Sequence, residues 1–272
     1  MVSSRRALAK GANHAAVSGM TLQRIFGKQD GMVENRNRFG QPIGPAVEGW
    51  TERPVPPHSA MSGRYCRVEK LNVERHGADL FAAYSEAPDS RDWTYLFAEA
   101  PADFTQYEAY LRNEVVKQDP LHHAIIDQAT GKAVGTAALM RIDRANGVIE
   151  VGHIAYSPRL KRSRAGTEAI FLLMGRAFDE LGYRRFEWKC DSLNAPSRRA
   201  AERYGFQYEG LFRQAVVYKG RSRDTAWFSI IEGEWPALRS AFELWLSPDN
   251  FDEQAAQRQS LAVLRAALAD QT

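Results

Sequence analysis

The stretch at residues 157–181, SPRLKRSRAGTEAIFLLMGRAFDEL, decides the fold class that the sequence predicts. It opens as a turn-prone loop that carries four cations and no acid before Glu168. The first turn of a helix offers unpaired N–H groups and a partial positive charge, so a basic loop that leads into a helix favours phosphate binding. The alternative is a solvated basic loop in front of a core helix. Apolar residues with a period of about 3.6 predict that helix; they are Ile170, Leu173, Met174, Ala177, Phe178 and Leu181.

The composition is that of an ordinary globular protein. The 272 residues are 44% hydrophobic and 25% charged, with a net charge of +3, so neither a nucleic acid nor a membrane surface is indicated as a partner. Cys66 and Cys190 lie far apart without a CxxC pair, which argues against a metal site and a disulfide framework and favours a reducing, cytoplasmic location. No apolar run approaches the roughly 20 residues that span a bilayer.

Two segments precede the part of the chain in which strand and helix patterns alternate. Residues 1–34 are basic and have no acid before Asp30, so we expect a flexible segment, with a targeting peptide or a later start as alternatives. Residues 35–62 are rich in proline and glycine and predict an extended arm. We expect this arm to pack on the core through its large apolar side chains, which are Phe39, Ile43, Val47 and Trp50.

Residues 63–234 alternate between strand and helix patterns, which predicts one α/β domain, and residues 235–272 predict a C-terminal helical extension. The expected strands are 65–71, 122–127, 133–142, 148–156, 185–190, 206–210, 215–219 and 225–231. The expected helices are 73–85, 102–117, the long helix after the basic loop, 196–204, 235–246 and 253–269. The long connection at residues 88–101 is expected to form a packed flap that shapes a pocket. Its large side chains are Trp93, Tyr95, Leu96 and Phe97.

Several motifs then follow one another in a specific order. A strand (IEVGHIAYSP, 149–158) leads into the basic loop and a helix headed by TEA, and a second strand (RRFEWKC, 184–190) leads into N-x-x-S and a GF pair. This order resembles the GNAT superfamily of N-acetyltransferases, and is most similar to the branch of ribosomal-protein N-terminal acetyltransferases. The resemblance extends over about residues 35–246. It implies a mixed, mostly antiparallel central sheet flanked by helices, with acetyl-CoA as the acyl donor and an amine as the acceptor.

The resemblance assigns the cofactor-binding residues. In this superfamily the loop before the long helix usually reads Gln/Arg-x-x-Gly-x-Gly/Ala, and its amides bind the pyrophosphate. Arg164 stands at the usual first glycine, which predicts either a differently shaped loop or impaired binding, while its guanidinium offers phosphate contacts. The strand before the loop is expected to bind the pantetheine arm, and Asn194 and Arg199 the rest of the coenzyme. The implied residues are Ile154, Ala155, Tyr156, Lys161, Arg162, Ser163, Arg164, Ala165, Gly166, Thr167, Asn194 and Arg199.

The implied catalytic residues are Ser197, Glu150 and His153. Ser197 ends the N-x-x-S motif and is expected near the departing thiolate, or only at a helix start. Glu150 and His153 are the candidate bases. They lie three residues apart on one strand and therefore on opposite faces, so that only one can face the cleft, and Glu150 is preferred because a carboxylate attracts a cationic amine.

Other polar residues near these motifs receive weaker assignments. His122 and His123 share the ambiguity of the two candidate bases. The tyrosine that many GNAT enzymes use as an acid is Ala201 here, and Tyr204 is expected to pack. Cys190 is expected to be buried on its strand. An ion-pair turn is expected from Arg221, Arg223 and Asp224.

The expected activity is therefore direct acetyl transfer from acetyl-CoA to a primary amine, either a protein N-terminus or a small amine. A catalytically silent acyl-CoA-binding or sensing protein is the alternative, because the loop glycine and the tyrosine are missing. A nucleic-acid-binding module would be a second alternative, tested by salt-sensitive binding. No membrane or nucleic-acid partner and no metal is expected, and a homodimer is left open.

Overall fold

The computed structural model describes residues 35–269, in two units that divide after Trp50. The described part of the first unit contains a short antiparallel hairpin of β1 (Asn35–Arg36) and β2 (Pro42–Ile43), and residues 44–50 after it form no strand or helix. In this unit the side chains of Phe39 and Val47 are exposed, as is that of Ile43, and their packing on a core stays a prediction. The flexible segment predicted at residues 1–34 lies outside the described residues.

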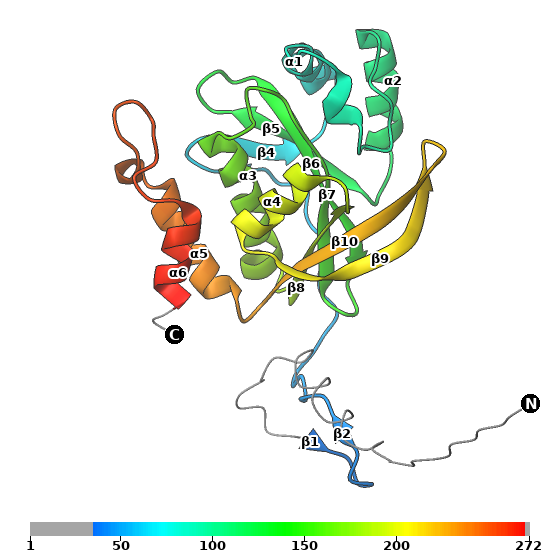
Figure 1. Cartoon of the computed structure of the whole chain (residues 1–272), viewed down its shortest axis with the longest axis vertical. Helices are drawn as coiled ribbons and strands as arrows, with labels where there is room; N and C mark the ends of the chain where they lie inside the picture. The colour runs from blue at the N-terminus through cyan, green and yellow to red at the C-terminus, as the bar shows by residue number, and fades with distance from the viewer. Residues whose placement is uncertain (1–34, 270–272) are drawn as a thin grey trace, which may run out of the picture. The chain divides into compact units, whose positions relative to one another are not determined.

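An eight-stranded sheet in the order β3-β4-β5-β6-β7-β8-β10-β9 forms the centre of the second unit (Figure 1). Its strands are β3 (Met61–Ser62), β4 (Cys66–Lys70), β5 (Leu121–Asp127), β6 (Ala133–Asp143), β7 (Val148–Tyr156), β8 (Arg185–Asp191), β9 (Gln207–Tyr218) and β10 (Arg221–Ile231). Neighbours in this sheet pair antiparallel, except that β7 and β8 run parallel. The predicted mixed, mostly antiparallel sheet is confirmed.

Alternating burial along β5 separates the two faces of the sheet. Ala124 and Ile126 join the core cluster formed with α1 and α2, whereas Ile125 between them joins the larger cluster that contains α3. We call these the α1/α2 face and the α3 face; the helices α4, α5 and α6 also contribute to the larger cluster. The helices are α1 (Val73–Tyr84), α2 (Phe104–Val115), α3 (Arg164–Gly175) with a π-helical continuation (Arg176–Glu180), α4 (Ala195–Tyr204), α5 (Trp235–Leu246) and α6 (Leu261–Ala269), with short 3-10 turns at Ser90–Trp93 and Pro248–Asn250. No helix of residues 35–269 is long and apolar enough to cross a bilayer.

Three elements of the structure, β9, β10 and α6, differ in extent from what was predicted. β9 is one strand, where two were expected, because its largely exposed residues do not alternate between apolar and polar. β10 begins at Arg221, so the residues expected in an ion-pair turn lie in a strand that continues through two register shifts. The last helix begins at Leu261 because Asp252 holds a turn: its Oδ1 accepts from the N–H groups of Gln254 (3.0 Å) and Ala256 (2.8 Å).

β7 parts from β8 halfway along its length. The two strands pair only from Val148 to Val151, which lies opposite Trp188. On its other edge β7 bulges against β6, since Gly152 pairs with Ala138 but Ala155 pairs with Thr136. A bulge adds a residue and bends the strand. The second half of β7 therefore turns away from β8, and its backbone edge faces a cleft.

Glu168 fastens α3 to the start of β4. Its buried carboxylate accepts hydrogen bonds from the backbone N–H groups of Arg64 (2.7 Å), Tyr65 (2.6 Å) and Cys66 (2.7 Å). Gly63 leaves room for this contact, because a Cβ there would lie 2.2 Å from the carboxyl carbon of Glu168. The loop that leads into α3 is thereby anchored to the sheet.

Replacing Glu168 by alanine is expected to lower the free energy of unfolding by about 3 kcal/mol, because it leaves three backbone donors without their acceptor. Urea denaturation measures this change. Glu202→Ala is the matched control, since Glu202 is exposed on α4 and its loss should cost less than about 0.5 kcal/mol. Equal effects of the two substitutions would show that the buried carboxylate is not an anchor.

Candidate active site

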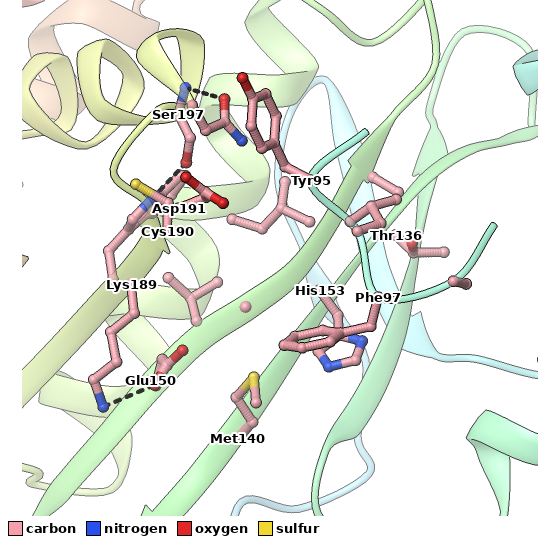
Figure 2. A pocket seen from close by; sticks show the side chains of 18 of the residues that line it. Tyr95, Phe97, Thr136, Met140, Glu150, His153, Lys189, Cys190, Asp191 and Ser197 are labelled. Atoms are coloured by element: carbon pink, nitrogen blue, oxygen red, sulfur yellow. Dashed lines mark hydrogen bonds and ion pairs between the residues drawn. The ribbon is translucent and has the colours of Figure 1, made fainter. Parts of the chain in front are cut away.

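Two adjoining cavities open where β7 and β8 part. The first, of about 680 Å³, lies between β7, β8, β10 and residues 93–98, and we call it the strand cavity (Figure 2). The second, of about 1010 Å³, lies between the loop at residues 160–167 and α4, and we call it the loop cavity. Residues that line both are Tyr84, Trp93, Leu96, Ile154, Ala155, Trp188, Asn194 and Ser197. A ligand that extends from one cavity into the other would pass Ser197.

Positive charge dominates the loop cavity. Among the described residues, five cationic side chains line it against one carboxylate, Asp92, whose Oδ2 lies 2.5 Å from Lys161 Nζ. Such an excess suits a ligand with several phosphate groups. The cations are Lys161, Arg162, Arg164, Arg199 and Arg203. Every predicted cofactor-binding residue except Ala165 lines this cavity: Ile154, Ala155, Tyr156, Lys161, Arg162, Ser163, Arg164, Gly166, Thr167, Asn194 and Arg199.

The basic loop enters α3 through a tight turn. Arg162 has a left-handed φ of 58°, and Ser163 then caps the helix, its Oγ accepting from the N–H of Gly166 at 2.9 Å. Gly166 approaches the loop closely, since a Cβ there would lie 2.6 Å from the carbonyl oxygen of Leu160. The first N–H groups of a helix have no partner within it. The turn therefore presents backbone donors beside the cations of the loop cavity.

Arg164 is accommodated without backbone strain at the position where the superfamily usually has glycine. It is the first residue of α3, and the left-handed residue of the loop is Arg162. Its guanidinium carbon lies 4.7 Å from the ring centre of Tyr65 and 4.8 Å from that of Phe251. These are cation–π distances. The left-handed turn of the loop therefore falls at Arg162, and the side chain of Arg164 is held by two rings.

Ser197 lies at the junction of the two cavities. Its Oγ accepts a hydrogen bond from the indole Nε1 of Trp188 at 2.9 Å, which leaves the hydroxyl hydrogen for another acceptor. Asn194 begins α4, its Oδ1 accepting from the N–H of Ser197 at 3.1 Å. Burial raises the pKa of the nearby Cys190 thiol. The thiol therefore stays protonated and is a poor nucleophile.

Glu150 and His153 both face the strand cavity, so the expectation that only one of them can do so was wrong (Figure 2). Ile149 and Val151 pack in the core of the α3 face, which leaves Glu150 on the opposite face. Simple alternation would place His153 on the α3 face. The bulge in β7 and the φ of 46° at His153 turn it back to the cavity. A left-handed non-glycine residue costs on the order of 1 kcal/mol or more and is typical of functional sites.

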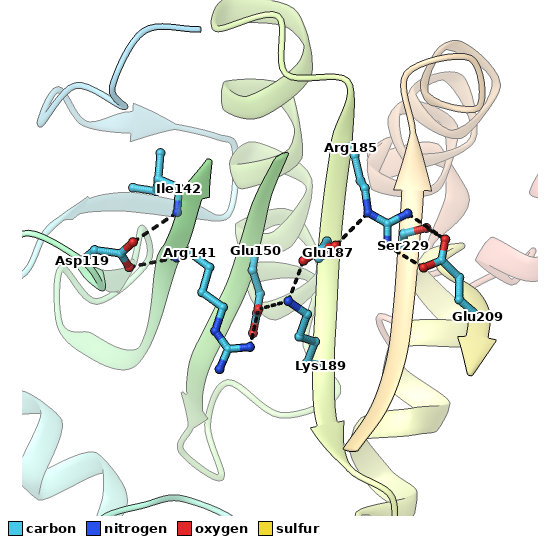
Figure 3. Close-up of polar contacts among 9 residues, drawn as sticks. All are labelled: Asp119, Arg141, Ile142, Glu150, Arg185, Glu187, Lys189, Glu209 and Ser229. Atoms are coloured by element: carbon cyan, nitrogen blue, oxygen red, sulfur yellow. Dashed lines mark hydrogen bonds and ion pairs between the residues drawn. The ribbon is translucent and has the colours of Figure 1, made fainter. Parts of the chain in front are cut away.

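The carboxylate of Glu150 belongs to a row of alternating charges that crosses the sheet (Figure 3). Its Oε2 lies 3.0 Å from Lys189 Nζ and 3.4 Å from Arg141. Burial raises the pKa of Glu150, and the charges of Lys189 and Arg141 oppose that shift. Beyond Lys189 the row continues through Glu187, Arg185 and Glu209. Glu150 is therefore a buried anion already paired with two cations.

His153 belongs to a second cluster, with Glu114 of α2 and His122 of β5. One nitrogen or oxygen of each lies within 4.8 Å of the others. His122 Nε2 lies 3.2 Å from Glu114 Oε2, and the two imidazole centres lie 5.1 Å apart, edge to face. Burial lowers the pKa of both histidines, that of His122 to about 4, while Glu114 acts in the opposite direction. Near pH 7 both rings are therefore neutral, beside a carboxylate that can stabilise a proton. His123 lines neither cavity.

Two imidazoles and a carboxylate are also a set that can bind a divalent cation. Lys117 makes this cluster less suited to a metal ion, because its Nζ lies 2.5 Å from Glu114 Oε1 and puts a positive charge beside the cluster. A divalent cation bound in the cluster would be repelled by the ammonium group of Lys117, because like charges repel strongly in a poorly hydrated site. The arrangement therefore suits a single transferable proton better than a metal ion.

The predicted flap at residues 88–101 covers the cleft. Trp93, Tyr95, Leu96 and Phe97 all line the strand cavity, and Phe97 stacks on His153 with centroids 6.4 Å apart. Two hydrogen bonds hold the middle of the flap: Tyr95 Oη donates to the carbonyl of Leu193, and Lys219 Nζ donates to the carbonyl of Trp93.

Sequence reasoning missed several polar residues of the strand cavity. A usable signal was present in RFEWKCD, where apolar residues alternate with charged ones and so place Lys189 on one face of β8. The other missed residues have no comparable signal in the sequence around them, because they reach the cavity from elements that are distant in sequence. The missed residues are Glu114, Arg141, Lys189 and Arg223.

Comparisons with known proteins agree with this geometry. A family model described as an acetyltransferase (GNAT) domain matches residues 70–207. A solved GCN5-related N-acetyltransferase from Brucella melitensis is 50% identical, covers 81% of this chain and 100% of that chain, and has a TM-score of 0.79. The uncharacterized N-acetyltransferase p20 of Bacillus licheniformis is 33% identical over 174 residues, which are 62% of this chain and 95% of that protein. A Bacillus subtilis protein named provisionally as a ribosomal N-acetyltransferase is 29% identical over 170 residues, 60% of this chain and 82% of that protein. The chain therefore belongs to the GNAT acetyltransferases, as the order of its motifs predicted.

Proposed function

We propose that this protein transfers the acetyl group of acetyl-CoA directly to a primary amine, with both reactants bound in one cleft. The observation that carries the proposal is the meeting of two unlike cavities at Ser197: one is rich in cations and backbone donors, and the other holds a buried acid–base cluster. A donor that bears phosphates suits the first, and an amine that must lose a proton suits the second. Orientation of two bound reactants supplies a large part of the rate in such transfers.

The loop cavity has the groups that coenzyme A requires. The N–H groups at the start of α3 and the guanidinium groups of Arg162 and Arg199 would bind its phosphates. The unpaired edge of β7 after Val151 would bind the amides of the pantetheine arm. Tyr84 fixes that edge, because its hydroxyl donates to the carbonyl of Ala155 at 2.9 Å. The thioester would then lie next to Ser197.

We assign the proton-accepting role to His153, and give Glu150 the role of a charged support. Glu150 is paired with Lys189 and Arg141, so accepting a proton there would leave those cations with less compensation. The imidazole of His153 is neutral near pH 7, faces the strand cavity, and lies close to the carboxylate of Glu114. The amine nitrogen would attack the thioester carbonyl carbon and pass its proton to His153. The C–S bond would then break, with the hydrogen of the Ser197 hydroxyl directed at the sulfur.

A silent acyl-CoA-binding protein remains the alternative function. It was suggested by the missing loop glycine and the missing tyrosine acid. The helical conformation of Arg164 and the orientation of the Ser197 hydroxyl by Trp188 weaken both reasons. Calorimetry with coenzyme A combined with a thiol-release assay over a panel of amines separates the two functions: a silent protein binds coenzyme A and releases no thiol.

Replacing Ser197 by alanine is expected to lower kcat for thiol release by about 10- to 100-fold, because a hydrogen bond to a developing charge contributes about 1.5–3 kcal/mol. The KM for acetyl-CoA should change little. The assay follows free coenzyme A with a thiol reagent, using peptides and small amines as acceptors. Ser222→Ala is the control, since Ser222 is exposed on β10. An unchanged kcat in the Ser197 variant would remove Ser197 from the mechanism.

A further inference from the structure

Arg223 is a buried cation that has no anionic partner among residues 35–269. It lies on β10, is 8% exposed, and lines the strand cavity. Its Nε donates to Thr225 Oγ1 at 3.2 Å, and its guanidinium carbon lies 5.6 Å from the ring centre of Phe97 and 5.8 Å from that of Tyr218. A buried charge normally has a counter-charge, because its desolvation is costly. Within the described part of the chain, the guanidinium of Arg223 contacts only a hydroxyl and the faces of two rings.

The other charges of the strand cavity are compensated. Among the described residues that line it, the three other cations each contact a carboxylate: Lys117 contacts Glu114, and both Arg141 and Lys189 contact Glu150. The cavity's third carboxylate, Asp191, is engaged elsewhere. It accepts hydrogen bonds from the N–H of Leu193 and the hydroxyl of Tyr218, each at 2.8 Å. Arg223 is therefore the cation of this cavity that is left for a ligand.

Arg223 also lies near the proposed point of transfer. Its positive charge acts on the thiol of Cys190, where it opposes the increase in pKa that burial causes. Ser197, which stands at the junction of the two cavities, lines the same strand cavity as Cys190 and Arg223. A group bound to Arg223 would thus be held close to the reacting amine.

We propose that Arg223 binds an oxyanion of the acceptor, a carboxylate or a phosphate, so that the acceptor is an amine that also carries an acid group. This inference rests on the proposed acetyl transfer and narrows its substrate class. A guanidinium offers a planar pair of donors that matches both kinds of oxyanion. The rings of Phe97 and Tyr218 limit its movement. A polycationic acceptor would be repelled by Arg223, whereas an amino acid or an aminoalkyl phosphate would neutralise it.

The test compares matched pairs of acceptors in the thiol-release assay. In the first kind of pair, an α-amino acid is the anionic member and its amide is the neutral member. In the second kind, an aminoalkyl phosphate is the anionic member and the corresponding amino alcohol is the neutral member. The wild-type protein should prefer the anionic member of one pair by about 10-fold or more in kcat/KM, and the pair that shows the preference identifies the oxyanion. Arg223→Met should lower kcat/KM for the anionic member by about 10- to 100-fold and leave the neutral member within about threefold.

Two controls separate recognition from structure. Arg221→Met removes an exposed arginine of the same strand and should leave both members unchanged. The Tm of Arg223→Met should equal or exceed that of the wild type, because an unpaired buried charge is removed. Equal kcat/KM for both members in the wild type, or an equal fall for both in Arg223→Met together with a lower Tm, would overturn the proposal. If no amine releases thiol, the proposed function fails, and calorimetric titration of the same pairs into the wild type and Arg223→Met still decides whether the oxyanion site exists.

Discussion

Replacing His153 by glutamine is expected to lower kcat/KM for the acceptor amine by about 100- to 10,000-fold, which is the usual contribution of a positioned base. Glutamine can keep a polar contact in the cavity and accepts no proton. The binding of acetyl-CoA should be unchanged, because His153 lines the strand cavity and not the loop cavity. Steady-state kinetics with acetyl-CoA and a reactive amine, together with calorimetry of acetyl-CoA binding, measure both quantities.

The pH dependence of the wild type should carry the signature of this base. Burial lowers the pKa of His153 below its ordinary value of 6.5, although the charge of Glu114 opposes the shift. The neutral ring is the active form, so kcat/KM should fall as the pH drops through a pKa below 6.5 and should be independent of this group above it. The variant should lose this acidic limb. A second limb, set by deprotonation of the free acceptor amine at higher pH, should persist in both proteins.

Two substitutions test the assignment against its rival. Glu150→Gln should lower kcat/KM less than His153→Gln does and should retain the acidic limb, because Glu150 supports the site through its ion pairs. His58→Gln, which removes an exposed imidazole, should have no effect. Retention of the acidic limb in the His153 variant, with its loss in Glu150→Gln, would transfer the role of base to the carboxylate.

The fold could be predicted because its determinants are local in sequence. The apolar period at residues 170–181 defines the long helix, and Ile170, Leu173 and Met174 are fully buried against the sheet as that period requires. The loop before this helix was likewise found from its own composition. The predictions of this helix and of the loop before it depend only on residues that lie close together in the sequence.

The site could be predicted only in part because two of its determinants are not local. The orientation of His153 depends on a bulge that forms between β7 and β6, and alternation along one strand does not reveal such a bulge. Gly152 was the available hint: a Cβ at this position would lie 2.4 Å from the sulfur of Met140 on the neighbouring strand. Arg223 was assigned to a turn because the register shifts of β10 interrupt its strand pattern.

Replacing Gly166 by alanine is expected to weaken acetyl-CoA binding by about 100-fold or more. The new Cβ would lie 2.6 Å from the carbonyl oxygen of Leu160 and 3.1 Å from a ring carbon of Tyr156. The first of these atoms is backbone, so the basic loop must move away from the start of α3. That movement separates the cations of the loop from the helix N–H groups, and several charge-assisted hydrogen bonds to phosphate would be lost together. Calorimetric titration with acetyl-CoA measures the change in Kd.

Gly175→Ala is the matched control, because it makes the same chemical change at the other end of the same helix. A Cβ at Gly175 would meet only Asp179 Oδ2, at an ordinary contact distance of 3.6 Å. Alanine is the better helix former, so this control should be unchanged or more stable by up to about 1 kcal/mol, and its Kd should equal that of the wild type. If Gly166→Ala binds acetyl-CoA as tightly as Gly175→Ala does, the close turn at Ser163 is not the phosphate site, and the cations of the loop cavity must bind the donor by their side chains alone.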